Sequence, residues 1–391
     1  MGDQGMTKKA AIVIIAFDRA VALSRLLTSL ANAVYQGGKD IPLVISIDNG
    51  GSPDVEVVAG KFVWEHGSKR VIKHNRNLGL REHVLFCGDL SSEYGAVVVL
   101  EDDLFVSPYF YEYVNASISF FESSDRVCQI SLYSPEINEF ARRPFLPVKD
   151  GYDNYFIQSA SSWGQIWTAR YWQGFREWYH QTAKKKYIQW AGVPSMVKDW
   201  PESSWKKYFI KYMHERNMFS VYPGVSLTTN WGDDGEHMKS AGVRFQVPLL
   251  LANKRYRFCE IESSISQYDA FFEPCEVLLK KLAPWCQNIQ ESIEADFYGL
   301  KQPCDINSEI LVSVKNCSDP TLSFGEQMHP PVSNVIFEVP GKDFAVGKAL
   351  HFKGLSYKFR FKILLETTKW VGCAGLVNGI KRRVIKCLKF K

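Results

Sequence analysis

The feature that most constrains the fold of this chain is an apolar run that ends in three acidic residues. Residues 96–100 read Ala-Val-Val-Val-Leu, and Glu101, Asp102 and Asp103 follow directly. A Val-rich run without helical periodicity is typical of a strand buried on both faces of a parallel sheet. Ligands bind at the carboxyl ends of such strands, and adjacent carboxylates there repel one another unless a cation or ligand hydroxyls compensate them. The triplet therefore predicts a divalent-metal or ligand site, with a solvated acidic loop as the alternative.

Apolar runs and helical patterns alternate along the first hundred residues. Further strands are predicted at 10–17, 41–47 and 71–74, and helices at 54–65 and 82–90. The first helix is marked by an apolar stripe at helical spacing, formed by Leu23, Leu26, Leu27 and Leu30. This alternation predicts an α/β fold that is Rossmann-like, with a mostly parallel sheet flanked by helices and a smaller C-terminal region.

The strand ends carry polar residues but no glycine-rich phosphate loop. Asp18 and Arg19 follow the first strand, Asp48 follows the second, and an Asn-x-Asn-x-Gly-Leu segment spans Asn75–Leu80. Neither GxGxxG nor GxxxxGK[ST] occurs in the sequence. The phosphates of a nucleotide ligand would therefore be held by a metal and by Arg or Lys.

Cysteine usage and charge distribution limit the cellular context. The nine cysteines form no CxxC pair, which disfavours a zinc site or disulfide framework and predicts a cytoplasmic protein. Residues 341–391 hold thirteen Lys and Arg but two acids, a local net charge of +11, whereas the whole chain carries +5. Such a basic amphipathic tail predicts a peripheral contact with the anionic inner face of the membrane, not nucleic-acid binding. A solvated helix, or one that docks on a partner, is the alternative.

These motifs, in this order, resemble the GT-A fold glycosyltransferases that use nucleotide sugars. The segments that carry the resemblance are Phe17-Asp18-Arg19, Asp48, Asn75–Leu80 and Glu101–Phe110 (Glu-Asp-Asp-Leu-x-Val-Ser-Pro-x-Phe). The chain is similar over about residues 10–245 to the N-acetylglucosaminyltransferase I-like family and to bacterial glycosyltransferases of surface polysaccharides.

The resemblance implies a role for each residue at the strand ends. Arg19 and Asp48 would lie near the base and phosphates of the donor, Glu101 and Asp102 would hold the base and ribose, and Asp103 would hold Mn²⁺ or Mg²⁺. Two further donor-binding candidates follow the third strand, Asn77 and Arg81. Arg81 would stabilise the leaving diphosphate, unless it is only a solvated residue at the start of a helix.

The resemblance fails at the catalytic base. Relatives place an Asp in the segment that corresponds to residues 155–167, whereas this chain has Ser159–Ser162 and Gln165, which lack a suitable pKa. The acidic, glycine-flanked loop at Asn230–His237 is the replacement. Asp234 is the predicted base, Asp233 or Glu236 the alternatives, and His237 a contact of the diphosphate or metal. A solvated turn is the other interpretation.

Two further segments have open interpretations. Residues 134–153 are predicted to be a surface loop that lines an acceptor cleft. Trp163 and Trp167 would stack on a sugar or pack in the core.

The predicted organisation has three parts. Residues 1–246 form the GT-A domain, 247–340 an extension or small subdomain, and 341–391 the basic tail. Short strands are expected at 309–314 and 334–339.

The predicted function is metal-dependent transfer of a hexosyl or N-acetylhexosaminyl group from a nucleoside-diphosphate sugar, UDP-linked, to an acceptor hydroxyl of a glycan or lipid-linked glycan. The resemblance favours inversion. The alternatives are a sugar-nucleotide nucleotidyltransferase and a non-catalytic, membrane-associated sugar-binding protein.

Overall fold

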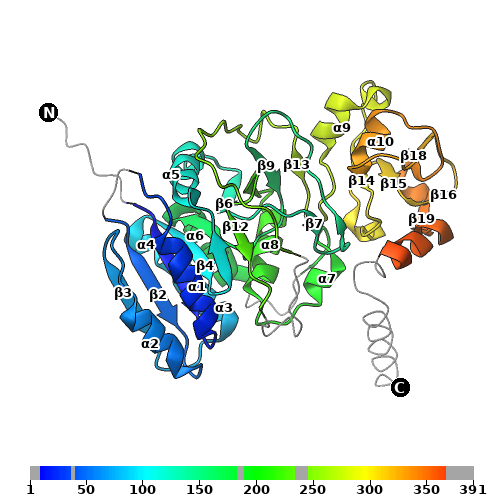
Figure 1. The fold of residues 1–391 in the computed structure, drawn as a ribbon. Helices are drawn as coiled ribbons and strands as arrows, with labels where there is room; N and C mark the ends of the chain where they lie inside the picture. The colour runs from blue at the N-terminus through cyan, green and yellow to red at the C-terminus, as the bar shows by residue number, and fades with distance from the viewer. Residues whose placement is uncertain (1–8, 37–39, 183–188, 234–244, 367–391) are drawn as a thin grey trace, which may run out of the picture. The chain divides into compact units, whose positions relative to one another are not determined.

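A computed structural model describes residues 9–36, 40–182, 189–233 and 245–366. The chain divides into two compact units (Figure 1). Unit 1 consists of Met1–Glu136 and Pro147–Phe272, and unit 2 of Ile137–Leu146 and Glu273–Lys391. The division therefore falls at 272, beyond the predicted boundary at 246. Residues 137–146, predicted to be a loop at an acceptor cleft, belong to unit 2.

Unit 1 is built on one nine-stranded sheet, and the predicted α/β class is confirmed. β1 pairs in parallel with β2 and β4, and β2 pairs in parallel with β3, so the carboxyl ends of these strands share one edge. β10 is antiparallel to both β4 and β6. In spatial order the strands are β13 (Gln267–Tyr268), β9 (Asn154–Ile157), β11 (Phe219–Pro223), β6 (Val127–Ser131), β10 (Gln165–Thr168), β4 (Ala96–Glu101), β1 (Ala11–Ala16), β2 (Leu43–Ile47) and β3 (Lys69–Lys73).

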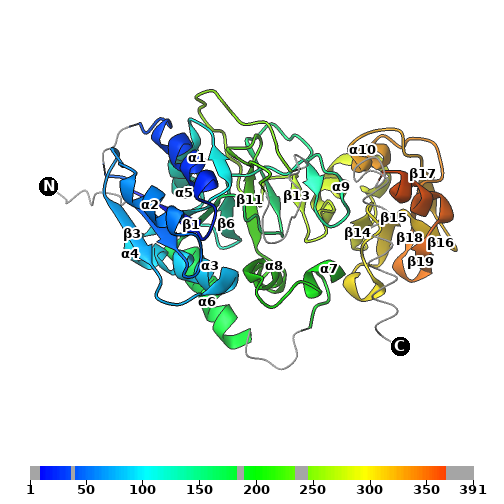
Figure 2. The same ribbon diagram turned by 60° about the horizontal axis from the view of Figure 1, so that its bottom comes forward.

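Helices connect the parallel strands and cover the sheet (Figures 1 and 2). The predicted apolar stripe of α1 is buried, because Leu23, Leu26, Leu27 and Leu30 are its core-facing side chains. Helices α3, α6 and α8 contact one another, whereas α1 contacts α2. The helices of unit 1 are α1 (Ala20–Ala31), α2 (Pro53–Lys61), α3 (Gly79–Asp89), α4 (Ser91–Tyr94), α5 (Phe110–Phe121), α6 (Ala169–Thr182), α7 (Ser195–Lys198) and α8 (Trp205–Glu215).

An aromatic cluster fills the space between the sheet and helices α6 and α8. The ring of Trp167 lies 4.3 Å from that of Trp172 and 5.5 Å from that of Trp205, centroid to centroid. Gly88 of α3 is part of this packing, since a Cβ there would come within 2.2 Å of the Trp172 ring. Trp167 therefore belongs to the core, which is one of its two predicted interpretations.

A short two-stranded sheet brings a distant segment to the acids. β5 (Leu104–Val106) begins one residue after Asp103, and it pairs antiparallel with β12 (Thr228–Asn230). The pairing continues past Asn230, because the Trp231 N–H donates to the Asp103 carbonyl oxygen at 2.9 Å. The start of the predicted loop at 230–237 thus lies directly beside the acidic triplet.

Unit 2 is a small β subdomain, one of the two organisations that the sequence left open. The predicted strand at 309–314 is confirmed as β15. β18 pairs with both β15 and β17, so residues 344–348 lie inside a sheet and the predicted tail boundary at 341 is too early. The strands are β7 (Ile137–Asn138), β8 (Arg143–Pro144), β14 (Ile293–Asp296), β15 (Ile310–Ser313), β16 (Lys315–Cys317), β17 (Leu322–Phe324), β18 (Phe344–Lys348) and β19 (Phe352–Leu355).

The strand predicted at 334–339 is wrong, because this region begins in a helix. α10 spans Pro331–Ile336, and Pro331 at its first position has the backbone angle that a helix start needs. The side chain of Asn334 accepts from the N–H groups of Gln327 and Met328 at 2.7 and 2.8 Å, which fixes the preceding loop to the helix. The other regular helices of unit 2 are α9 (Glu276–Leu282), η1 (Pro284–Cys286), η2 (Pro303–Asp305) and η3 (Ala349–His351).

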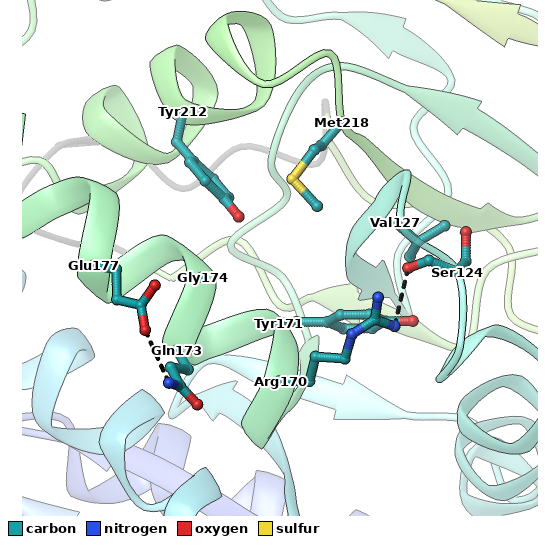
Figure 3. Close-up of a pocket in the computed structure, with 9 residues that line it drawn as sticks. All are labelled: Ser124, Val127, Arg170, Tyr171, Gln173, Gly174, Glu177, Tyr212 and Met218. Atoms are coloured by element: carbon teal, nitrogen blue, oxygen red, sulfur yellow. Dashed lines mark hydrogen bonds between the residues drawn. The ribbon is translucent and has the colours of Figure 1, made fainter.

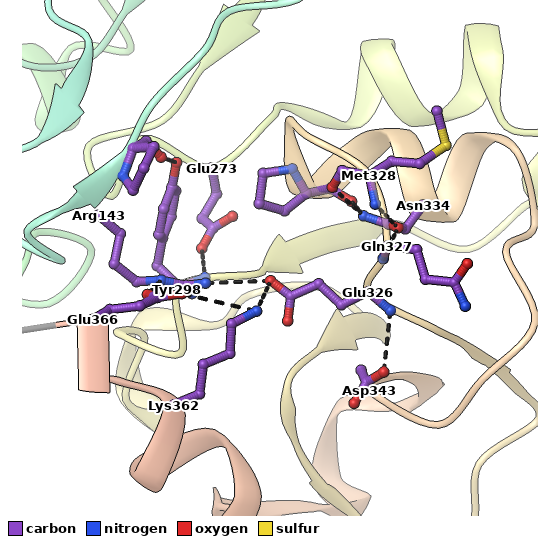
Figure 4. Close-up of polar contacts among 12 residues, drawn as sticks. Arg143, Glu273, Tyr298, Glu326, Gln327, Met328, Asn334, Asp343, Lys362 and Glu366 are labelled. Atoms are coloured by element: carbon purple, nitrogen blue, oxygen red, sulfur yellow. Dashed lines mark hydrogen bonds and ion pairs between the residues drawn. The ribbon is translucent and has the colours of Figure 1, made fainter. Parts of the chain in front are cut away.

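A buried arginine from the 137–146 segment organises the core of unit 2 (Figure 4). Arg143 Nε donates to Glu366 at 2.7 Å, and Nη2 donates to Glu326 at 3.3 Å. Lys362 Nζ lies 2.6 Å from the same Glu326 carboxylate. The Arg143 guanidinium is 5.1 Å from the centroid of the Phe359 ring. This network ties the helical residues 357–366 to a segment more than two hundred positions earlier in the chain.

None of the helices in the described part of the chain combines the length and apolar character needed to cross a bilayer.

Candidate active site

The topology gathers the polar residues of three strand ends at one edge of the sheet. β1 lies between β2 and β4, so Arg19, Asp48 and the acids Glu101–Asp103 follow three adjacent parallel strands. This is the edge at which open α/β sheets bind ligands. The adjacency that the sequence pattern predicts is therefore present.

Arg19 joins the two aspartates of the triplet. Its Nη1 donates to Asp103 Oδ2 at 2.9 Å, and its Nη2 donates to Asp102 Oδ1. The side chain of Asp102 is 5% exposed and that of Asp103 is 15% exposed, so the three charges are largely withdrawn from water. The two carboxylates raise the pKa of the Arg19 guanidinium, against the effect of burial. Arg19 therefore acts as the internal counter-ion of the triplet.

One carboxylate oxygen of the triplet has no such partner. Asp103 Oδ1 is buried and has no hydrogen-bond partner in the described part of the chain. No group of three or more His, Cys, Asp and Glu suited to a metal occurs among the described residues. Mg²⁺ and its relatives need only one or two protein carboxylates when phosphate and water complete the shell. Asp103 thus fits a cation that is held jointly with a phosphate ligand.

If all three acids were ionised, they would carry more negative charge than Arg19 compensates. Burial raises the pKa of Asp102 to about 6, with the Asp103 charge adding to the rise and Arg19 opposing it. Burial, followed by the Asp103 charge, raises the pKa of Glu101 to about 8. Lys206, in the first turn of α8, acts in the opposite direction on Glu101. A second cation or a ligand with hydroxyl donors would relieve this repulsion.

The segment after β12 is attached to helix α1 beside the triplet. Arg25 of α1 forms an ion pair with Asp233, and its guanidinium lies 4.8 Å from the centroid of the Trp231 ring. Gln246 Nε2 donates to the Trp231 carbonyl oxygen at 2.9 Å. Asp233, a predicted alternative for the base, is thus brought to the site but has one oxygen engaged by Arg25. The other members of this predicted loop, Asp234, Glu236 and His237, lie outside the described residues.

Asp48 stabilises the start of helix α3. Its Oδ1 accepts from the Leu78 N–H at 2.8 Å, and its Oδ2 accepts from the Gly79 N–H at 3.0 Å. A carboxylate at this position satisfies helix N–H groups that have no partner within the helix. Asn77 is exposed and donates to the Asn49 carbonyl oxygen at 2.9 Å. Their contacts with a donor remain predictions.

Arg81 contacts the segment that precedes α8. Its Nη1 donates to the Glu202 carbonyl oxygen, and its guanidinium lies 5.6 Å from the centroid of the Tyr208 ring. Both contacts belong to a half-buried side chain, so the interpretation of Arg81 as a solvated helix start is incomplete. Its predicted role at a leaving diphosphate is untested.

Sequence reasoning missed Arg25 as a neighbour of the site. Arg25 lies among the polar positions of an amphipathic helix, and nothing in its spacing distinguishes it from a solvated surface residue. Its partners, Trp231 and Asp233, come from a segment more than two hundred residues later. Only the β5–β12 pairing brings them together.

A cavity of about 340 Å³ lies elsewhere in unit 1 (Figure 3). It adjoins the first residue of β6 and the first turns of α6, at the edge of the sheet opposite the acids, and is therefore not part of the acidic site. Arg170, at its wall, donates to the Ser124 carbonyl oxygen at 3.3 Å. The residues that line it are Ser124, Val127, Arg170, Tyr171, Gln173, Gly174, Glu177, Tyr212 and Met218.

Comparison with known proteins finds distant structural likenesses. No family model and no curated protein sequence matches the chain. Residues 1–349 of S. aureus TarS in complex with UDP-GlcNAc are 13% identical, with a TM-score of 0.39 over 60% of this chain and 62% of that one.

Two further solved structures are similarly distant. The same TarS fragment in complex with UDP is 12% identical, with a TM-score of 0.38 over 56% of this chain and 59% of that one. The mannosyltransferase PcManGT from Pyrobaculum calidifontis, in complex with GDP-Man and Mn²⁺, is 8% identical, with a TM-score of 0.31 over 46% and 48%. The chain thus spans less than two thirds of each of these structures. The residues of the chain itself remain the basis for assigning it a function.

Proposed function

We propose that the chain is a metal-dependent glycosyltransferase of GT-A type that transfers a sugar from a nucleoside-diphosphate donor to an acceptor hydroxyl. The observation that carries the proposal is the Arg19–Asp102–Asp103 cluster at the carboxyl edge of the sheet, in which Asp103 Oδ1 is buried without a partner. A divalent cation that is held together with a diphosphate would supply the positive partner that this carboxylate oxygen lacks.

The residues of the site have separate roles in this proposal. Asp103 holds Mn²⁺ or Mg²⁺ through Oδ1, and Arg19 fixes the orientation of its carboxylate through Oδ2. Glu101 and Asp102 bind the hydroxyls and base of the nucleoside. The bound cation would stabilise the negative charge that develops on the departing diphosphate.

The catalytic base is proposed to come from the loop that follows β12. The attachment of Trp231 and Asp233 to Arg25 supports this, because it fixes the start of the loop beside Asp103. Since Asp233 is paired with Arg25, Asp234 remains the first candidate for the base, followed by Glu236. An Asp234→Asn variant is expected to lose turnover and keep donor binding, whereas turnover like that of the wild type would exclude Asp234.

The test of the donor site is calorimetry with UDP and GDP, each with and without Mn²⁺. The proposal expects binding that depends on Mn²⁺ and is lost in Asp103→Asn. Asp54→Asn, which removes a carboxylate in the first turn of α2, is the matched control. Hydrolysis of a panel of nucleotide sugars would then identify the donor. Absence of metal-dependent nucleotide binding in the wild type favours the non-catalytic sugar-binding alternative.

The proposal includes a membrane-associated acceptor. Unit 2 exposes large apolar side chains among cations near the end of the described chain. Tyr357 is 92% exposed, Leu350 is 78% exposed, and Lys353 and Lys358 are exposed beside them. Apolar side chains interspersed with Lys suit an anionic lipid surface, where a lipid-linked glycan acceptor would be found.

A further inference from the structure

Two buried amide side chains near the acids have hydrogen-bonding atoms without a partner. Gln165 is 1% exposed and Asn230 is 3% exposed. Oε1 and Nε2 of Gln165, and Oδ1 of Asn230, have no hydrogen-bond partner among the described residues. Leaving a buried amide unpaired costs free energy, so each such group in a folded protein calls for an explanation.

The pairing of β10 places Gln165 at the carboxyl edge of the sheet. β10 is antiparallel to β4, and Gln165 is in register with Val99, two residues before Glu101. Side chains two positions apart along a strand share a face, and their spacing is about 7 Å. Gln165 therefore lies on the same face as Glu101, about one pleat repeat deeper.

The pairing of β12 places Asn230 beside Asp103. Asn230 is in register with Leu104, and the next residue, Trp231, donates its N–H to the Asp103 carbonyl oxygen at 2.9 Å. The same strand is attached to the segment before β10, because Thr228 Oγ1 donates to the Trp163 carbonyl oxygen at 2.6 Å. The two unpaired amides thus come from neighbouring segments that both reach the acidic edge.

The geometry points to Gln165 and Asn230 as the residues that bind the hydroxyl groups of the donor's sugar. This inference rests on the proposed function, since the sugar adjoins the diphosphate that Asp103 would hold. A sugar hydroxyl donates and accepts, and so does a side-chain amide. An amide is also neutral, so it adds no negative charge next to a diphosphate, as a third aspartate would.

A third buried amide, in the same sheet as Gln165, provides the control. Gln129 of β6 is fully buried, but its Oε1 accepts from Ser220 Oγ at 2.8 Å and its Nε2 donates to the Ser161 carbonyl oxygen at 3.4 Å. Gln129→Leu would leave these groups unpaired and lower the melting temperature. Gln165→Leu removes an amide that is already unpaired, so the ligand-free protein should be at least as stable as the wild type.

The experiment compares Gln165→Leu, Asn230→Leu and Gln129→Leu with the wild type, each in Mn²⁺. Calorimetry measures the affinity for UDP or GDP, whichever the wild type binds, and for its sugar-linked forms. We expect the first two variants to bind the bare diphosphate within about threefold of the wild type. Their kcat/KM for the sugar nucleotide, measured by steady-state kinetics, should fall about five- to tenfold, since one lost hydrogen bond is worth up to about that factor.

The outcomes separate the inference from the proposed function. A wild-type protein that binds no nucleoside diphosphate contradicts the proposed function. If it binds the diphosphate, unchanged kcat/KM in Gln165→Leu and Asn230→Leu overturns the inference. That result would indicate that the amides bind internal water molecules. Equal losses for diphosphate and sugar nucleotide overturn it too, because they indicate a general structural role.

Discussion

The guanidinium of Arg25 lies over the ring of Trp231, 4.8 Å from its centroid, and pairs with Asp233 two residues further on. Trp231 is half exposed, and its ring lies 6.1 Å from that of Phe105 in β5. Arg25 therefore attaches the start of the loop that would carry the base to α1, and Trp231 attaches it to β5, the strand that follows the acids.

Arg25→Ala should weaken this attachment without unfolding unit 1. An exposed cation–π contact and a partly exposed ion pair contribute about 1–2 kcal/mol together, which corresponds to a roughly five- to thirtyfold rise in KM for the donor. Steady-state kinetics of sugar-nucleotide hydrolysis measure this KM. Arg70→Ala removes a guanidinium that pairs with Glu93 on the surface and is the control. If the two variants have the same KM, Arg25 has no part in the site.

Arg19→Ala should destabilise the ligand-free protein, because it removes the counter-ion of two largely buried carboxylates. Loss of one partner from such a cluster costs about 2–4 kcal/mol in the free energy of unfolding. Mn²⁺ should restore more stability to this variant than to the wild type, since both oxygens of Asp103 become available. Chemical unfolding with Mn²⁺ and with chelator measures the difference; an equal gain in both proteins would argue against a cation at Asp103.

A buried histidine should make a contribution to the stability of unit 1 that decreases below about pH 6.5, in opposition to the raised pKa values of Glu101 and Asp102. Burial lowers the pKa of His83 from 6.5 to about 4. The imidazole faces Ser46, whose hydroxyl lies 2.8 Å from Nε2, and the charges of Asp48 and His74 act on it. The Cys87 thiol also contacts Ser46.

The sign of this effect follows from the proton balance. Between pH 6.5 and 4 the unfolded chain binds a proton at residue 83 that the folded protein does not, so stability decreases as the pH falls. The full loss is at most about 3 kcal/mol. Urea unfolding from pH 7.5 to 4.5 should show that the wild type loses stability relative to His83→Gln as the pH falls. The same slope in both proteins would assign the acid sensitivity to other groups.

The exposed apolar side chains of unit 2 should bind anionic vesicles. Changing Tyr357 and Phe361 to Ser removes two side chains that are 92% and 62% exposed. Membrane affinity should fall at least about a hundredfold, because transfer of each of the two large apolar side chains is worth about 1.5 kcal/mol or more. Co-sedimentation with anionic and neutral vesicles tests this. Serine at Val21 and Val63, both 72% exposed in unit 1, is the control, and equal binding by both double variants would refute the proposed surface.

Local sequence patterns predicted most of the strands and helices of unit 1, because apolar runs and stripes mark these elements. The apolar run at 96–100 and the Leu stripe of α1 became β4 and α1, since burial of each pattern requires the element that was expected. The proximity of Arg19 to the acids could be predicted from the parallel pairing of β1 and β4 alone.

Contacts between distant segments could not be predicted from local sequence patterns. Arg25 and Trp231 meet only because β12 pairs with β5, and the antiparallel insertion of β10 between β4 and β6 brings Gln165 to the acidic edge. Residues 334–339 have the composition of a strand, but the backbone preference of Pro331 and the loop contacts of Asn334 select a helix. Periodicity carries no information about any of these partners.

The chain enters unit 2 twice, which sets an order of events during synthesis. Residues 137–146 leave the ribosome long before Glu326, Lys362 and Glu366, the partners that surround Arg143. At 5–20 residues per second, about 10–45 s separate the emergence of Arg143 from that of Glu366. During this interval the central sheet can form while Arg143 lacks the carboxylates with which it pairs in the folded protein. The newly made protein thus passes through a stage in which a chaperone has a defined ten-residue segment to protect.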